Sequence, residues 1–469
     1  MSSPKKEVEE DEPVTPAGRM FLQPEMDQVI NCAIGLQHPI DLQAFKEAIK
    51  KSMMVQHPRF RSLYVKDKHG REHWRKVKEV DIDKHVFEQS ITKDDVCKVA
   101  DDDEEVVNEY LADLAVSSPL KTDKPLWEIH VLRDQKCLIL RIHHSLGDGV
   151  SLMSLFLTCC RRVGHPDELP NIGPALTGGI KDTTSIFAKV WRLVLVSLLT
   201  LVFVLKFILR SLWVKDEKTV ISGGYEVELW PRKLATAKFK LEDMKLVKKA
   251  VNNGTINDVL FGVISSGLTR YLDMRSSKEI KEGHQFTGLA MVNIRQQPGL
   301  QDLSDLMKNE SLSRWGNQFG FILLPLYHHK DIDDPLQYMR RAKAMLDRKK
   351  LSLEAHFSYR IGKLVMSLLG PKVAALLNYR VICNTSFTIS NVVGPQEELM
   401  FAENPITYLR VNSTSLSHAI TMHMVSYAGN ADMQILVAKE IIPDPQVLAK
   451  CFQDALLEMK DAAMGAKIQ

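Results

Sequence analysis

Residues 137–149 read CLILRIHHSLGDG and combine an apolar run, a histidine pair and a turn with two glycines. The apolar run predicts a buried strand, and the apolar residues 150–157 that follow predict the start of a helix. Successive side chains of a strand point to opposite faces, so His143 and His144 are expected to point in opposite directions. His144 continues the wholly apolar face of the strand, where a base is kept away from bulk water.

An imidazole has a pKa of about 6.5 and can take a proton from a hydroxyl near neutral pH. A histidine pair alone more often ends a core strand, but HHxxxDG at a strand–turn–helix junction favours catalysis. We therefore expect His144 to act as a general base, with His143 in a secondary role. Asp148 is expected to support the loop, and Gly147 and Gly149 to permit the turn and close approach of substrate.

The composition of the whole chain excludes several classes of protein. Its 469 residues are 45% hydrophobic and 25% charged, with a net charge of +3, and give no sign of a nucleic-acid partner. Seven scattered cysteines without a CxxC pair indicate a reducing compartment and no metal site. There is no P-loop and no dinucleotide fingerprint, so no cofactor is expected. The first residues lack the apolar segment of a cleavable signal.

Strands and helices alternate along the chain, which predicts an α/β protein with two related mixed sheets flanked by helices. We expect a disordered tail over residues 1–13, a first domain over 14–180 carrying HHxxxDG, a linker over 181–230 and a second domain over 231–469. Besides the strand before His144, the expected strands are 77–82, 125–132, 235–240, 286–295, 319–326, 387–393, 408–414, 419–427 and 433–438. The expected helices are 41–54, 101–116, 241–251, 255–272, 334–369 and 444–462.

An apolar helix is expected over residues 186–214, inside the linker. Its uncharged part, 193–205, covers only about 20 Å as a helix, against roughly 30 Å of hydrocarbon in a bilayer. Two tryptophans flank it, and its basic residues fall on one side of a helical projection: Lys189, Arg192, Lys206 and Arg210. This pattern favours a helix that lies in a membrane interface or dips into it, rather than a buried core helix.

HHSLGDG preceded by PLWEIHVL resembles the acyl-CoA-dependent acyltransferases of the chloramphenicol acetyltransferase-like superfamily. Four further segments, in order, resemble the plant-type wax ester synthase/diacylglycerol acyltransferase family: VTPAGR at 14–19, NDV at 257–259, MVNIR at 291–295 and NVVGP at 391–395. The likeness covers nearly the whole chain. The plant alcohol acyltransferases of secondary metabolism are expected to carry DFGWG, and residues 317–321, NQFGF, do not match it.

The resemblance implies two chloramphenicol acetyltransferase-like domains and direct attack of an alcohol on acyl-CoA, the co-substrate. The implied acceptor is a long-chain fatty alcohol or diacylglycerol, so the products are wax esters and triacylglycerol. Another acceptor alcohol, sterol or phenolic, or a non-catalytic lipid-binding protein remains the alternative. The implied location is the endoplasmic reticulum membrane, in contact with membrane lipid and with both domains in the cytosol, or the plasma membrane.

The same resemblance suggests roles for residues outside HHxxxDG. Asn257 is either a substrate-binding residue that serves the oxyanion or the acyl chain, or a helix-start residue, and Ser426 is a second binding candidate. Arg295 is expected to pair with Asp148. A structural turn is expected at Asn391, Gly394 and Pro395.

Overall fold

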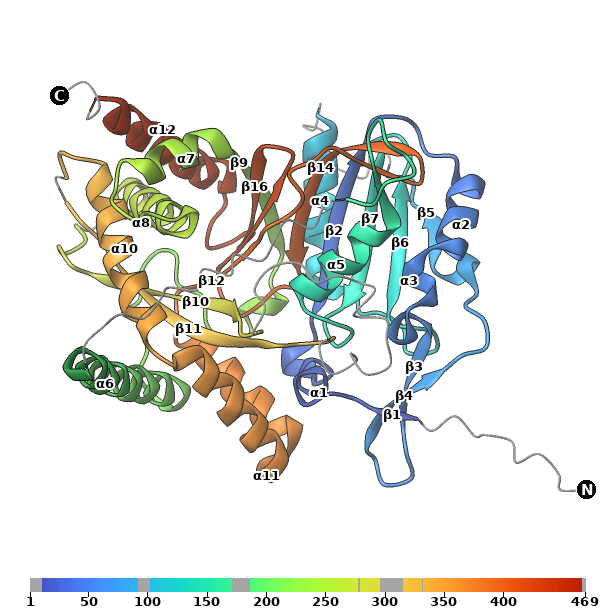
Figure 1. Ribbon diagram of the computed structural model, residues 1–469, viewed down its shortest axis with the longest axis horizontal. Coiled ribbons are helices and arrows are strands. Elements are labelled where there is room, and N and C mark those ends of the chain that lie inside the picture. Colours follow the sequence, from blue (N-terminus) through green and yellow to red (C-terminus); the bar gives the residue numbers. More distant parts are fainter. Residues whose placement is uncertain are drawn as a thin grey trace, which may run out of the picture.

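A computed structural model of the protein describes residues 11–91, 102–170, 186–276, 279–295, 315–330 and 332–465. Two mixed sheets stand next to each other (Figure 1). The seven-stranded sheet has the order β5 (Val86–Glu88), β6 (Trp127–Leu132), β7 (Cys137–His143), β2 (Val29–Leu36), β14 (Asn404–Ser413), β13 (Leu399–Phe401), β8 (Cys160–Arg162). The six-stranded sheet has the order β11 (Phe319–Tyr327), β10 (Gln285–Asn293), β12 (Phe387–Val392), β15 (Ile420–Tyr427), β16 (Asn430–Ala438), β9 (Arg232–Lys240).

The strands β13 and β14 cross from one half of the chain to the other. They leave the six-stranded sheet after β12, join the seven-stranded sheet beside β2, and return to β15. Residues 399–413 therefore belong to the first sheet, and the predicted division into 14–180 and 231–469 does not describe the sheets. The physical reason is that β2 lies inside the sheet, with β7 on one side, and needs a partner for its second row of backbone hydrogen bonds.

Helices cover both sheets (Figure 1). One large core packs α7 (Leu241–Lys249), α8 (Ile256–Arg275), α10 (Leu336–Leu351) and α12 (Pro445–Gly465) on the six-stranded sheet. The seven-stranded sheet carries α2 (Leu42–Lys51), α3 (Met53–Gln56) and α5 (Gly149–Cys159) on one face and α4 (Asp103–Ser117) on the other. The remaining helices are α1 (Pro16–Phe21), α6 (Ile186–Leu212), α11 (Glu354–Cys383) and the 3-10 turns Pro24–Met26, Pro58–Arg61, Ile82–Lys84 and Val227–Leu229.

Helix α4 ties the two sheets together. Glu104 forms ion pairs with Lys238 on β9 (2.6 Å) and with Arg410 on β14 (2.8 Å). Asn108 donates a hydrogen bond to the hydroxyl of Thr236 on β9 at 3.3 Å. Segments that precede and follow α6 in the chain are thus held in one body.

Three expectations near the N-terminus need correction. Glu12–Pro13 form a short strand, β1, which pairs with β4 (Glu72–Lys76), so the predicted tail ends earlier; residues 1–10 lie outside the described residues. The strand predicted at 77–82 is absent from that stretch of the described chain. Instead β4 precedes it and pairs with β3 (Ser62–Lys66). The helix expected over 41–54 is broken at Ser52, which adopts an extended backbone.

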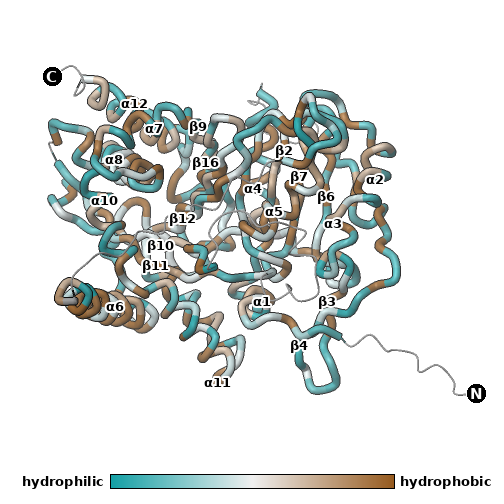
Figure 2. The backbone as a smooth tube through the Cα atoms, viewed as in Figure 1, coloured by the Kyte–Doolittle hydropathy of each residue, from teal (hydrophilic) through white to brown (hydrophobic). Residues whose placement is uncertain are grey.

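The apolar helix α6 is present and lies on the outside (Figure 2). Trp191 and Leu201 on it are each 65% exposed, and Trp213 just beyond it is 67% exposed. The prediction that Arg210 belongs to a basic side facing the membrane interface is wrong. Its side chain is buried and forms an ion pair with Asp216 at 2.7 Å, so it holds the end of α6 against the protein.

Helix α11 is a second long apolar helix, and it packs against α6 (Figure 1). Among the described residues, Phe187–Leu212 and Glu354–Cys383 are long and apolar enough to cross a membrane by length and composition. If only one of these helices crossed a membrane, it would separate strands that the fold joins. Strand β14 follows both helices and pairs with β2, which precedes them. The link from α4 to β9 places the segment between the two helices in the same body.

Candidate active site

Strand β7 delivers His144 to a cavity between the two sheets. Leu140, Ile142 and His144 all line this cavity, as the alternation of strand side chains predicts. His143 points elsewhere: its Nε2 lies 2.8 Å from a carboxylate oxygen of Asp27, and its Nδ1 accepts the N–H of Ser145 at 3.1 Å. The predicted assignment of the two histidines to opposite faces is therefore confirmed.

The cavity is apolar and runs across the junction of the sheets. Alternate residues of five strands form its walls: Ile30 and Cys32 on β2, Leu409 and Val411 on β14, Leu289 and Met291 on β10, Phe319 and Phe321 on β11, and Thr388 and Ser390 on β12. These residues alternate along their strands because they lie on the face that looks into the cavity, and Asn391 and Asn412 line it as well. This mainly apolar space suits long apolar chains, with few polar groups to fix a reacting centre.

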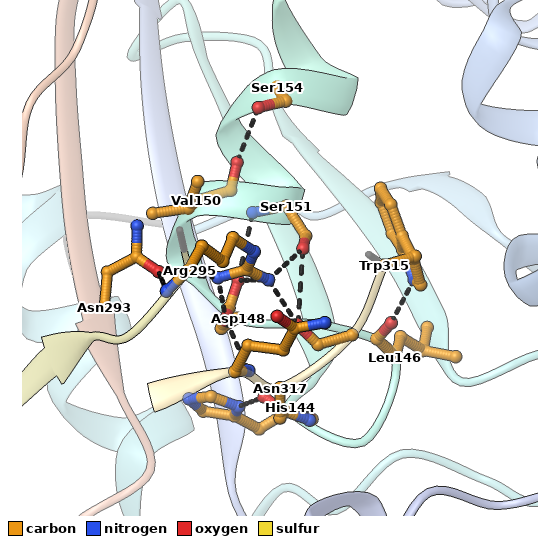
Figure 3. Close-up of polar contacts among 12 residues, drawn as sticks. His144, Leu146, Asp148, Val150, Ser151, Ser154, Asn293, Arg295, Trp315 and Asn317 are labelled. Atoms are coloured by element: carbon orange, nitrogen blue, oxygen red, sulfur yellow. Dashed lines mark hydrogen bonds and ion pairs between the residues drawn. The ribbon is translucent and has the colours of Figure 1, made fainter. Parts of the chain in front are cut away.

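Asp148 holds the turn that follows the histidines. Its Oδ1 accepts the N–H of Ser151 at 3.0 Å and so caps α5, and its Oδ2 accepts the N–H of Gln318 at 2.9 Å. Arg295 donates to both oxygens, at 2.7 and 3.0 Å (Figure 3), which confirms the predicted pair. The side chains of Arg295 and Asp148 are only 4% and 7% exposed. The carboxylate is thus fully engaged in joining the turn to residues of the second half.

Arg295 binds further groups around the turn. It donates to the carbonyl oxygen of Gly316 at 2.7 Å and to the hydroxyl of Ser151 at 2.9 Å (Figure 3). The indole N–H of Trp315 donates to the carbonyl oxygen of Leu146 at 2.7 Å. The histidine turn and residues 315–318 therefore form one hydrogen-bonded unit.

Asn317 determines which ring nitrogen of His144 carries the hydrogen. Its amide Nδ2 donates to the carbonyl oxygen of His144 at 2.8 Å, which turns the amide oxygen Oδ1 toward the imidazole Nδ1 at 3.0 Å (Figure 3). An amide oxygen only accepts, so Nδ1 must carry the hydrogen and Nε2 keeps its lone pair. Nε2 has no hydrogen-bond partner among the described residues. This is the tautomer that a base facing the cavity needs.

The ring of His144 lies beside two aromatic side chains. Phe21 stacks on it with ring centroids 4.2 Å apart, and the ring of Phe319 lies 5.9 Å away. Burial lowers the pKa of His144 from its ordinary value. The imidazole is therefore neutral near pH 7 and able to accept a proton.

The two turn glycines have different surroundings, and neither has a left-handed backbone. A side chain at Gly149 would lie 3.1 Å from Val392, and Gly149 lines the cavity. Gly147 is not among the residues that line the cavity and packs toward Leu152 and Trp315; its predicted contact with substrate stays a prediction. Close packing, rather than unusual dihedral angles, explains the small residues.

The predicted binding residues of the second half lie beside the cavity rather than in it. The hydroxyl of Ser426 accepts the N–H of Gly394 at 3.1 Å, so it is used to hold the turn at Gly394 and Pro395. Asn257 is exposed, and its Oδ1 accepts the amide of Asn391 at 2.8 Å. Asn391 itself lines the cavity, although a structural turn was expected there. Asn391, rather than Asn257, therefore lines the cavity, and the substrate-binding role of Asn257 stays a prediction.

Three polar residues of the site escaped the sequence analysis: Asn317, Asn293 and His423. Asn293 accepts the backbone N–H of Arg295 at 3.0 Å and lines the cavity. His423 on β15 also lines the cavity, and burial followed by the nearby charge of His144 lowers its pKa to about 4. Its Nδ1 is buried without a partner in the described part of the chain. Only MVNIR, which contains Asn293, gave any signal for these residues.

Two family models match the chain. Residues 29–212 match the wax ester synthase/diacylglycerol acyltransferase catalytic domain, and residues 315–460 match the WS/DGAT C-terminal domain. Wax ester synthase/diacylglycerol acyltransferase 5 of Arabidopsis thaliana is 35% identical and covers 97% of this chain and 95% of its own. Wax ester synthase/diacylglycerol acyltransferase 4 of the same plant is 34% identical and covers 97% and 91%.

Solved structures show the same fold. A wax ester synthase/diacylglycerol acyltransferase from Marinobacter aquaeolei VT8 has a TM-score of 0.61 at 16% identity, covering 96% of this chain and 99% of that chain. The first condensation domain of the calcium-dependent antibiotic synthetase has a TM-score of 0.57 at 12% identity, covering 97% and 96%. The predicted two-domain α/β fold is thereby confirmed.

Proposed function

The chain belongs to the wax ester synthase/diacylglycerol acyltransferase family, and from this premise we propose that it is an acyl-CoA-dependent O-acyltransferase. It esterifies long-chain fatty alcohols to wax esters and diacylglycerol to triacylglycerol. The observation that carries the proposal is His144, whose Nε2 keeps its lone pair beside an apolar cavity while Asn317 fixes Nδ1.

The reaction needs one proton carrier. The alcohol oxygen attacks the thioester carbonyl carbon, and its proton passes to Nε2 of His144. The C–S bond then breaks, the ester is released, and the proton passes from His144 to the departing thiolate to give CoA thiol. No enzyme-bound acyl intermediate is required, because the base makes the alcohol itself nucleophilic enough to attack. Phe21 and Phe319 keep water from the ring of His144.

The thioester oxygen gains negative charge during attack and needs a hydrogen-bond donor. Asn257 and Ser426 are not among the residues that line the cavity. His423 also lines the cavity and supplies a neutral imidazole with one N–H. We assign it this donor role.

Labelled palmitoyl-CoA, supplied with hexadecanol and with dioleoylglycerol in parallel, tests the function. We expect labelled ester from both acceptors with the wild-type protein. Transfer to a sterol or a phenolic alcohol alone would assign the protein to another acceptor class. Binding of palmitoyl-CoA without any transfer would make it a lipid-binding protein.

We further propose that α6 lies along the cytosolic face of the endoplasmic reticulum membrane, or of the plasma membrane, with both sheets in the cytosol. Two observations support this placement. The exposed side chains of α6 are mainly apolar over its length, and the strands before and after it pair with each other. A single crossing would put β2 and β14 on opposite sides of the bilayer, which the hydrocarbon layer does not permit.

The exposed turns at Gly70, before α6, and Gly429, after it, can carry inserted glycosylation acceptor sites. We expect neither to be glycosylated, and we expect a membrane-impermeant reagent to reach both from the cytosolic side of sealed microsomes. Glycosylation at Gly429 in active enzyme, with Gly70 still cytosolic, would contradict the placement. Insertion of the same site into a known lumenal reporter serves as the positive control.

A further inference from the structure

We propose that a second cavity, between α1, α6 and α11, takes up the apolar chain of the acyl acceptor from the membrane and leads it to His144. The inference rests on the proposed function, whose acceptors are long-chain alcohols and diacylglycerol. It assigns a role to a cavity of about 350 Å³ that is separate from the histidine cavity.

The inner end of this second cavity borders the active site. Phe319 and Phe321 on β11 line both cavities, so the two spaces share an aromatic wall. The Phe319 ring is 5.9 Å from the His144 ring and 6.1 Å from Phe21. A change in the rotamers of Phe319 and Phe321 joins the two cavities. An apolar chain that passes these rings brings its hydroxyl end to His144.

The outer part of the cavity lies where the two apolar helices meet. Phe207 and Ile208 on α6 face Tyr359 and Gly362 on α11 across it. Ile208 is exposed, and the outward sides of both helices present further exposed leucines, such as Leu205 on α6 and Leu368 on α11. A ligand dissolved in the membrane therefore meets the opening of the cavity without crossing water.

The polar groups of the lining argue for an uncharged ligand. The hydroxyl of Ser358 is bonded to the backbone of Phe321, and the amide of Asn378 donates to the carbonyl oxygen of Ala374. Lys363 is the only cation among the described lining residues, and its ammonium lies over the Tyr359 ring. The phosphates of CoA would require several cations, so acyl-CoA reaches His144 by another path.

Gly362 allows the cavity to be filled from α11. A Cβ at this position has no heavy atom within 4 Å, so a side chain can start from Gly362 without a clash at its first atom. We expect Gly362→Phe to reduce kcat/KM for hexadecanol by about tenfold, the effect of losing contacts to about two methylene groups. Activity with butanol should remain within about twofold, because a short, water-soluble alcohol does not need the cavity.

Matched variants separate blockage from general damage. The loss with hexadecanol should grow with side-chain size, in the order Gly362→Ala, Gly362→Leu, Gly362→Phe. Gly465→Phe makes the same replacement at the end of α12, where a side chain also meets nothing, and should have no effect. Ser211→Phe, from the α6 side of the cavity, repeats the test if Gly362→Phe does not fold.

The outcomes decide the inference independently of the proposed function. Loss confined to long-chain acceptors supports it. Equal loss with butanol and hexadecanol, no loss with hexadecanol, or a changed preference for acyl-CoA chain length would overturn it. Failure of the wild-type protein to form ester from any acceptor would instead refute the proposed function.

Discussion

Replacement of His144 by alanine is expected to lower the rate of ester formation by about 10² to 10⁴-fold, the usual contribution of a general base. Nε2 of His144 presents its lone pair to the cavity. Alanine has no such group, so the alcohol proton is left without an acceptor. Steady-state transfer from palmitoyl-CoA to hexadecanol measures the loss. The thermal midpoint of the variant shows whether it remains folded.

His143→Ala is the matched control for this variant. The imidazole of His143 does not line the cavity and binds Asp27 and Ser145, so its loss affects the geometry of the turn. A measurable fraction of activity should remain. Equal loss from both replacements in folded proteins would show that the proton does not pass to His144.

The pH dependence gives a second readout for His144. Protonated imidazole cannot accept a proton, so kcat/KM should fall as the pH drops through the pKa of His144 in the free enzyme. Burial lowers this pKa, so the fall should occur below the ordinary value of about 6.5. A fall centred well above that value would contradict the buried, neutral base.

Replacement of Arg295 by alanine is expected to destabilise the protein by about 3–5 kcal/mol, the typical cost of breaking a buried ion pair. The carboxylate of Asp148 would keep only its backbone donors in a site that is almost closed to water. Urea unfolding measures the change. Arg71→Ala removes an exposed partner of Asp67 and should have a much smaller effect on stability.

Asp148→Asn tests whether this carboxylate holds the turn that positions His144 or itself accepts the proton of the alcohol. We expect lower stability and up to about 100-fold lower kcat, because the turn that aims His144 loses its charged anchor. The acid limb of the pH profile should persist and move to lower pH, since the charge of Asp148 raises the pKa of His144. Disappearance of that limb would make Asp148 the proton acceptor.

Local patterns were sufficient to predict the site's centre. The strand before His144, the helix after Gly149 and the opposite faces of the two histidines depend only on residues within one segment. The capping box of α8, with Thr255 and Asp258, is likewise formed within one short segment. Interactions of short range leave a periodic or positional signature in the sequence.

Contacts between distant segments left no such signature. Asn317 lies 173 residues after His144, and nothing around it distinguishes a partner of an imidazole from a surface asparagine. The strand β2 was missed because its residues 29–36, VINCAIGL, are buried largely on both faces and show no alternation. The kink at Gly370, with φ of 83°, and Pro371 hid the continuation of α11 to Cys383.

The pairing of β2 with β14 governs how this protein can be made in a cell. Ile30 finds its partner, Ser413, only after 383 further residues have been added, since 413 minus 30 is 383. At about 5–20 residues per second, the first sheet stays incomplete on the ribosome for roughly 20–80 seconds. During that time one edge of β2 is unpaired and α6 has already emerged, so the nascent chain is open to chaperones and aggregation before any active site exists.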